Sequence, residues 1–181
     1  MGGSGIGRRS VAGRRISPLL VAALAGCVAA AASSAEAREV VGRIVSVADG
    51  DTVTLLDGEK HQHKVRLDGI DAPEKGQAFG DRSKQSLSEL AYGRDARADC
   101  QKTDKYRREV CKVYVDGEDV GLDQIQRGMA WHFKRYESEQ RSEDRRAYAD
   151  AEVEARKAKR GLWRDPQPVP PWDFRARGVA K

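Results

Sequence analysis

Short runs of strand-forming residues, separated by turn signals, fill the middle of the chain and constrain its fold more than any other feature. Val, Ile, Thr and Leu are interleaved with polar residues in five such runs: Glu39–Ala48, Thr52–Leu56, Lys60–Leu67, Arg94–Cys100 and Glu109–Val115. Asp57-Gly58 is a strong hairpin signal between the second and third runs. The middle of the chain is therefore predicted to form a small sheet of short strands.

Three segments between and after these strands are predicted to be helices. Asp81 or Ser83 is expected to cap the first, which runs to about Tyr92, and the second covers Val120–Arg127. The third covers Glu137–Arg160, where mostly small residues recur at spacings of three and four: Tyr148, Ala151, Ala155, Ala158 and Leu162. The predicted fold is α+β, a five-stranded OB-type Greek-key β-barrel with about three helices, over residues 38–164. The Pro-rich residues 165–181 are expected to form an extended tail.

The start of the chain has the pattern of an export signal. Four arginines between residues 8 and 15 precede an apolar stretch over Ile16–Ala32, and Ala35-Glu-Ala37 follows. This pattern predicts a signal peptide over residues 1–37, cleavage after Ala37 and a periplasmic or secreted product. As an alternative, Leu24-Ala-Gly-Cys27 resembles the bacterial lipobox, in which case Cys27 would be lipidated and would anchor the protein to a membrane. The apolar stretch is short for a membrane span, so the mature form is expected to lack a transmembrane helix.

The charge and cysteine counts are most informative once this segment is removed. The segment carries four of the 33 basic and one of the 28 acidic side chains, which leaves a net charge of about +2. Nucleic-acid binding would then depend on a local patch and not on overall charge.

Cys100 and Cys111 flank a predicted hairpin, where facing positions bring side chains within bridging distance. We expect a disulfide in an oxidising compartment, with two buried free thiols as the alternative.

Carboxylates and arginines recur where predicted strands end and turns begin. The three segments are Asp49-Gly-Asp-Thr52, Arg66-Leu-Asp-Gly-Ile-Asp-Ala-Pro-Glu74 and Asp104-Lys-Tyr-Arg-Arg108. Carboxylate oxygens from separate turns suit a hard cation such as Ca²⁺, and guanidinium groups can bind a phosphate bidentately. Although 34% of the chain is charged, this grouping indicates phosphodiester chemistry.

The three segments resemble, in order and spacing, the signature segments of the staphylococcal nuclease (thermonuclease) family. The resemblance spans roughly residues 40–163 and includes the region around Trp131. It implies a Ca²⁺ site with Asp51, Asp71 and the backbone carbonyl of Ala72 as ligands. By the same resemblance, Arg66 and Arg108 would bind the phosphate, and Glu74 would act as the general base. Lys105 and Tyr106 are expected to shape the nucleotide pocket.

The implied activity is Ca²⁺-dependent hydrolysis of DNA and RNA, preferably single-stranded or unstructured, with little sequence preference and with 3′-phosphate products. The enzyme would be a monomeric endonuclease. The alternative is a catalytically inactive OB module that binds single-stranded nucleic acid or a protein partner. Such a module would not need Asp51, Arg66, Asp71, Glu74 and Arg108 together, and this chain has all five.

The turn at Arg107 and the pair of strand histidines lead to two further predictions. Arg107 stands where the family usually has Gly, so the turn is expected either to change its conformation or to place Arg107 in competition with Arg108 for the phosphate. His61 and His63 alternate on one predicted strand, but no third ligand lies near them in the sequence, so we predict exposed polar positions and not a metal site.

Overall fold

The structure is a computed structural model that describes residue 1 and residues 38–179. Apart from Met1, the predicted export signal lies outside the described residues, and so do its cleavage point after Ala37 and the alternative lipidation at Cys27.

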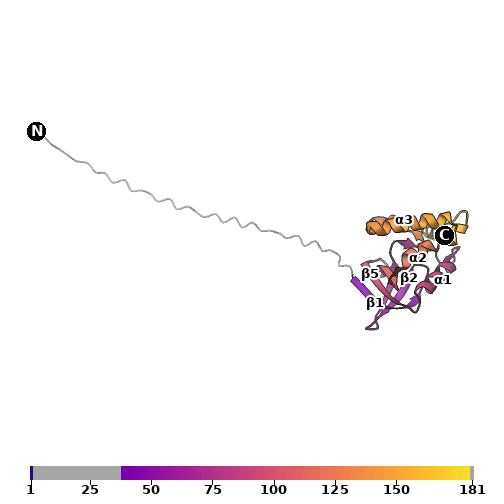
Figure 1. Cartoon of the computed structure of the whole chain (residues 1–181), viewed down its shortest axis with the longest axis horizontal. Coiled ribbons are helices and arrows are strands. Elements are labelled where there is room, and N and C mark those ends of the chain that lie inside the picture. The colour runs from indigo at the N-terminus through magenta and orange to yellow at the C-terminus, as the bar shows by residue number, and fades with distance from the viewer. Residues whose placement is uncertain (2–37, 180–181) are drawn as a thin grey trace. The chain divides into compact units, whose positions relative to one another are not determined.

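Five strands close into a barrel (Figure 1). In spatial order, neighbouring strands are antiparallel, and a parallel pairing of the first strand with the last closes the barrel. The predicted α+β class with a five-stranded OB-type barrel is confirmed. That spatial order is β3 (Gln62–Leu67), β2 (Thr52–Asp57), β1 (Arg38–Val47), β5 (Asp95–Thr103) and β6 (Glu109–Val115), and the short β7 (Glu118–Asp119) pairs with β6.

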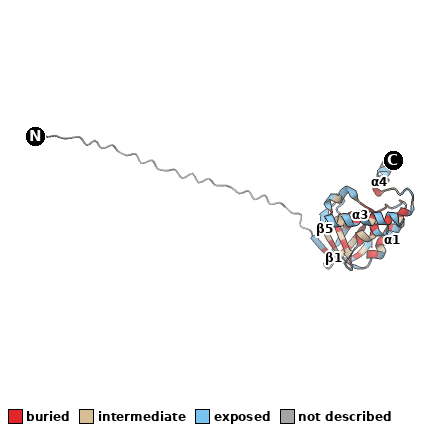
Figure 2. Cartoon of the chain, turned by 45° about the horizontal axis from the view of Figure 1, so that its top comes forward, coloured by how far each residue is buried: buried red, intermediate tan, exposed pale blue. Residues whose placement is uncertain are grey.

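Alternate strand residues point into the barrel and form its core. In β6, Cys111, Val113 and Val115 are buried, whereas the residues between them are partly exposed. Ile44 of β1 and Leu55 of β2 are completely buried, as the period-two alternation of half-buried strands requires. Figure 2 shows this alternation of buried and exposed positions along the strands.

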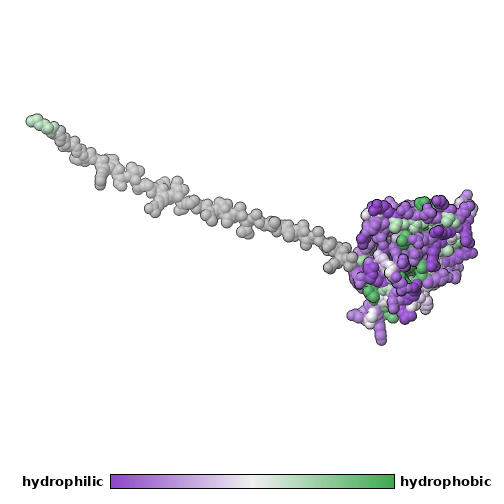
Figure 3. Space-filling model, viewed as in Figure 1, coloured by the Kyte–Doolittle hydropathy of each residue, from purple (hydrophilic) through white to green (hydrophobic). Residues whose placement is uncertain are grey.

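The helices cover the barrel and leave polar side chains outside. They are α1 (Gly80–Ala91), α2 (Val120–Gln126), α3 (Ser142–Lys157) and α4 (Pro171–Val179), together with the 3₁₀ helices η1 (Lys134–Glu139) and η2 (Gly161–Arg164). The face drawn in Figure 3 is largely hydrophilic. Within the described ranges, no helix combines the length and the apolar character that a membrane span requires.

The start of α1 differs from the prediction. Neither Asp81 nor Ser83 caps the helix, which begins at Gly80 after Phe79, a residue with a positive φ of 67° and no capping hydrogen bond. A Cβ atom on Gly80 would lie 2.1 Å from the backbone oxygen of Glu74, so the preceding loop folds tightly onto the helix start. Ser83 instead donates a hydrogen bond of 2.6 Å to the backbone oxygen of Met129.

The third predicted helix is shorter than expected. Its first part is η1, and α3 begins only at Ser142 and ends at Lys157. Tyr148 and Ala155 are buried as the small-residue stripe predicts, but Ala158 is exposed. The chain turns there because Lys159 takes a positive φ of 50°.

The C-terminal tail is not extended throughout, which corrects the prediction for residues 165–181. Residues 171–179 form α4. Proline suits the first position of a helix because its fixed φ is helical and its missing N–H needs no partner there. The amide of Phe174 donates to the backbone oxygen of Pro170 over 3.0 Å, which starts the helix.

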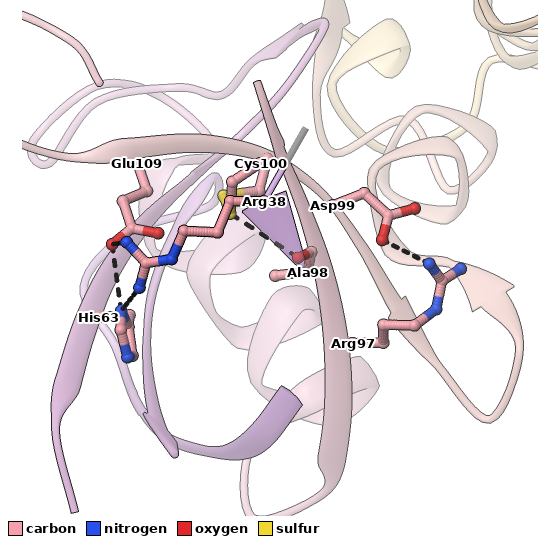
Figure 4. Close-up of a disulfide and its surroundings, with 8 residues drawn as sticks. Arg38, His63, Arg97, Ala98, Asp99, Cys100 and Glu109 are labelled. Atoms are coloured by element: carbon pink, nitrogen blue, oxygen red, sulfur yellow. Dashed lines mark hydrogen bonds and ion pairs between the residues drawn. A yellow bond between two sulfur atoms is a disulfide. The ribbon is translucent and has the colours of Figure 1, made fainter. Parts of the chain in front are cut away.

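A cross-linked seam joins β5, β6 and β3. Cys100 and Cys111 face each other in the β5–β6 register and form a disulfide, with Cα atoms 4.0 Å apart. Beside it, His63 contacts Glu109 over 3.0 Å and Asp57 over 2.8 Å (Figure 4 shows the contact with Glu109). The prediction that both histidines are exposed is therefore wrong for His63, whose side chain is 10% exposed. Hydrogen bonds to Asp57, and then to Glu109, raise the pKa of His63 above its usual value.

We predict that His63→Gln destabilises the fold more at low pH than at high pH. A raised pKa means that the charged imidazole stabilises the fold fully below its ordinary pKa of about 6.5, and that this benefit disappears as the pH rises through the folded-state pKa. Denaturant unfolding should show a loss of about 1 kcal/mol at pH 5 and a smaller loss at pH 9. His61→Gln is the matched control, because that exposed side chain should matter little at either pH. Equal losses at both pH values would contradict the prediction.

Candidate active site

The structure brings the separate charged segments together at one end of the barrel. Asp51 lies in the turn before β2, and Arg66 lies on β3. Asp71 lies on β4 (Ile70–Asp71), which pairs with β8 (Trp131–His132) so that Asp71 faces Trp131. The Arg66 guanidinium lies 3.3 Å from an Asp51 oxygen and 3.0 Å from an Asp71 oxygen. One arginine thus joins two carboxylates from different segments, the turn before β2 and the short strand β4.

The two aspartates are buried and well supported. Asp51 is 6% exposed and Asp71 is 1% exposed. Asp51 accepts hydrogen bonds from the Ala72 backbone amide over 2.8 Å and from the Thr52 hydroxyl over 3.0 Å. Burial raises the pKa of Asp71, while the hydrogen bond from Arg175 and the charge of Arg66 act in the opposite direction. The Asp71 carboxylate therefore depends on nearby positive charge to remain ionised.

Asp49 supports the turn that carries Asp51. Its side chain accepts a hydrogen bond of 3.0 Å from the backbone amide of Asp51. Burial, and then the charge of Asp51, raises the pKa of Asp49 to about 6.

A buried amide behind this turn is a supporting residue that the sequence did not indicate. Gln124 of α2 is fully buried and donates hydrogen bonds to the backbone oxygens of Gly50 and Ser83, over 2.8 and 3.1 Å. A Cβ on Gly50 would lie 1.8 Å from the Ser83 hydroxyl, so only glycine allows this turn to pack against α1. No local pattern distinguishes Gln124 from a surface glutamine.

The donor set suits a hard divalent cation. Asp51 and Asp71 offer buried carboxylate oxygens, and Glu74 adds a third carboxylate beside them that is 35% exposed. Carboxylate and carbonyl oxygens are the ligands that Ca²⁺ prefers. Two guanidinium groups, from Arg66 and Arg175, already contact these carboxylates, which shows that the site attracts cations. The Ala72 amide contact places that residue's backbone next to Asp51, and its carbonyl remains a predicted ligand.

Arg108 reaches the same site from the hairpin before β6. Its Nη1 donates to the Thr52 hydroxyl over 3.3 Å, and that hydroxyl in turn contacts Asp51. Asp104 Oδ2 lies 2.8 Å from both Nε and Nη2 of the same guanidinium and so holds it in place. The Arg108 side chain is 22% exposed, so part of it remains open to a phosphate.

The hairpin keeps its left-handed residue in spite of the missing glycine. Arg107 has a positive φ of 64°, so the expectation that the turn would change its conformation is wrong. Asp104 stabilises the turn by accepting hydrogen bonds of 2.9 Å from the amides of Tyr106 and Arg108. Among the described residues, the exposed Arg107 side chain makes no hydrogen bond or ion pair, whereas Arg108 is held toward the site. Tyr106 is 66% exposed, with the Lys105 ammonium 5.0 Å from its ring centre.

Glu74 follows β4, and its surroundings include a residue that the sequence did not identify. The Glu74 amide donates to the Gln77 side chain over 3.0 Å. Its carboxylate contacts Arg175 of α4, which also contacts Asp71. The sequence does contain one signal for this helix. Pro170-Pro171 is typical of a helix start, and aromatic residues and Arg175 follow it.

The chain matches known proteins across this domain. The family model described as "Staphylococcal nuclease homologue" matches residues 64–165. An "Uncharacterized endonuclease" of Haemophilus influenzae is 38% identical over 133 residues, which covers 74% of this chain and 71% of that protein. "Protein ParB" of Escherichia coli is 38% identical over 171 residues (90% of this chain, 93% of that protein). "Micrococcal nuclease" of Shigella flexneri is 34% identical over 143 residues (74% and 79%). With its five-stranded barrel and its three charged segments gathered at one end, this chain belongs to the staphylococcal nuclease family.

Proposed function

We propose that this protein is a Ca²⁺-dependent endonuclease that hydrolyses DNA and RNA with little sequence preference and releases 3′-phosphate ends. The observation that carries the proposal is the contact of Arg66 with both Asp51 and Asp71. This contact joins a cation-binding carboxylate pair to a phosphate-binding guanidinium. Family membership and the nuclease names of several relatives support a nuclease.

The rival function is a catalytically inactive OB module that binds single-stranded nucleic acid or a protein partner. A binding module needs exposed basic and aromatic groups, but it has no need for two buried aspartates. Burial of ionised carboxylates destabilises a fold unless they are paired. Asp51 and Asp71 are 6% and 1% exposed, so a role that uses their charge accounts for them better.

The proposed reaction assigns one role to each group. Glu74 accepts a proton from the attacking water, whose oxygen forms the new bond to phosphorus as the bond to the 5′ oxygen breaks. The 5′ oxygen takes up a proton as it leaves, and the phosphate stays on the 3′ oxygen. Arg66 and Arg108 donate hydrogen bonds to the phosphate oxygens, where negative charge develops in the transition state. A bound Ca²⁺ would neutralise phosphate charge and help to orient the water.

The proposed substrate is a single-stranded or unstructured nucleic acid. The exposed ring of Tyr106, beside the Lys105 ammonium, offers a surface on which any base or sugar can pack. Stacking of this kind tolerates every base, which fits low sequence preference. We further propose that the enzyme acts as a monomer after export, either free in the periplasm or medium or anchored through Cys27.

We predict that cleavage of single-stranded DNA and RNA requires Ca²⁺ and stops when a chelator is added. Glu74→Gln should lower the cleavage rate about 10²- to 10⁴-fold, because the amide cannot accept the proton. Rates measured with labelled oligonucleotides, together with end-group analysis of the products, check both points. Nucleic-acid binding without any cleavage would support the inactive module and contradict the enzyme.

We also predict that the two neighbouring hairpin arginines differ sharply. Arg108→Ala should lower the cleavage rate about 10²- to 10³-fold, because a phosphate contact is lost. Arg107→Gly should leave the rate near that of the wild type. It should also raise the free energy of unfolding by up to about 1 kcal/mol, because glycine adopts a positive φ without strain. A large loss of activity in Arg107→Gly, with Arg108→Ala little affected, would show that Arg107 binds the phosphate instead.

A further inference from the structure

Helix α4 is attached to the domain at its first turn. Trp172 stacks on Phe133 with ring centres 5.6 Å apart and an interplanar angle of 12°. It also meets Trp131 edge-on at 5.6 Å. Just before the helix, the backbone oxygen of Val169 accepts a hydrogen bond of 2.7 Å from Gln77. These contacts hold the start of α4 beside the loop that carries Glu74.

One turn further on, Arg175 reaches into the candidate active site. Its Nη2 lies 2.7 Å from Asp71 Oδ2, and its Nη1 lies 3.2 Å from Asp71 Oδ1. The same Nη1 lies 2.5 Å from a Glu74 oxygen. The guanidinium therefore makes a bidentate pair with one proposed cation ligand and a second contact with the proposed base. Bidentate arginine–carboxylate pairs are among the stronger polar contacts in proteins.

This arrangement occupies the groups that the proposed function needs. Asp71 Oδ2 is held by Arg175, and Asp71 Oδ1 is shared between Arg175 and Arg66. Within the described part of the chain, oxygens of Asp51, Asp71 and Glu74 do not all lie within 4.8 Å of one another. A divalent cation that binds Asp71 must compete with the guanidinium for the same oxygen atoms. The contact with Arg175 also occupies an oxygen of Glu74, the group that the proposed reaction uses as its base.

Arg175 and its partner Asp71 differ in solvent exposure, and this difference suits a contact that can break and form again. The Asp71 side chain is 2% exposed and fixed by its neighbours, whereas the Arg175 side chain is 43% exposed. The guanidinium can therefore leave toward solvent without opening the barrel. Trp172 would keep the helix close to the domain after such a release.

We propose that Arg175 is a built-in counter-ion of the candidate active site, which competes with the divalent cation for Asp71 and Glu74 and is displaced when the cation binds. The proposal rests on the cation site of the proposed function. Before the cation binds, Arg175 neutralises the carboxylates and keeps Glu74 from acting as a base. Once the cation is bound, Glu74 is free to accept a proton, and the later part of α4 loses its contact with the domain.

The direct test is Ca²⁺ binding by the purified chain, measured calorimetrically without nucleic acid. Arg175→Gln should bind Ca²⁺ about fivefold more tightly or better, because the competitor is gone. Arg175→Lys keeps the charge but cannot form the bidentate pair. Its affinity for Ca²⁺ should therefore lie between those of the wild type and Arg175→Gln. Arg177→Gln is the matched control, since it removes the same charge from the same helix and, among the described residues, makes no ion pair with Asp71 or Glu74. Unchanged or weaker binding in Arg175→Gln would overturn the proposal.

Hydrogen exchange supplies a readout that is independent of affinity. Adding Ca²⁺ to the wild type should speed amide exchange in the second half of α4, while the strands remain protected. In Arg175→Gln the same segment should already exchange fast without Ca²⁺. Exchange in α4 that does not respond to Ca²⁺ would also overturn the proposal.

Asp71→Asn separates failure of this proposal from failure of the proposed function. If neither the wild type nor Arg175→Gln binds Ca²⁺, or if Asp71→Asn binds it as the wild type does, the proposed cation site itself is wrong, and the role of Arg175 fails with it. If Asp71→Asn loses binding while the wild type and Arg175→Gln bind equally, the cation site stands and only the competition by Arg175 is refuted.

Discussion

The contact of the Arg66 guanidinium with Asp51 and Asp71 is the interaction on which the rest of the site depends. Two buried carboxylates repel each other and lose their hydration, and several kcal/mol would be lost if either charge remained unpaired. Pairing with one arginine brings the β1–β2 turn, β3 and β4 to the same end of the barrel. The strand register serves this arrangement, because Thr52 lies opposite Arg66 and the amide of Leu67 donates to the backbone oxygen of Asp51 over 2.8 Å.

The rest of the domain supports this cluster from behind. Gln124 ties α2 to the turn at Gly50. The rings of Trp131 and Trp163, with centres 4.4 Å apart, pack together where β8 pairs with β4. Farther from the site, the buried carboxylate of Glu152 pairs with Lys134 and Arg156 and so secures α3 to the chain that follows β8. The barrel supplies rigidity, and the segments that carry the chemistry lie in turns and strand ends at one end of it. This division of roles is common in folds that support catalysis.

The sequence predicted the strands and the three charged segments well, because both depend on local patterns. Residue alternation and Asp-Gly turns determine where a strand begins and ends, and the motif residues are adjacent along the chain. Two of the features that it missed depend on distant contacts. Arg175 meets Asp71 across 104 residues of chain, and His63 meets Glu109, on β6, only when the barrel closes. Arg107 retains a positive φ because Asp104 accepts hydrogen bonds from two amides in the turn, and no propensity scale records that support.

We propose that Asp51 and Asp71 hold a cation beside a phosphate bound by Arg66 and Arg108. The most direct measurement is a crystal structure of the chain with Ca²⁺ and a short single-stranded oligonucleotide whose scissile linkage resists hydrolysis. We expect Ca²⁺ in contact with oxygens of both aspartates, one phosphate within hydrogen-bond distance of both arginines, and Arg175 withdrawn from Asp71. Ca²⁺ bound elsewhere, or a phosphate held away from Arg66 and Arg108, would contradict it.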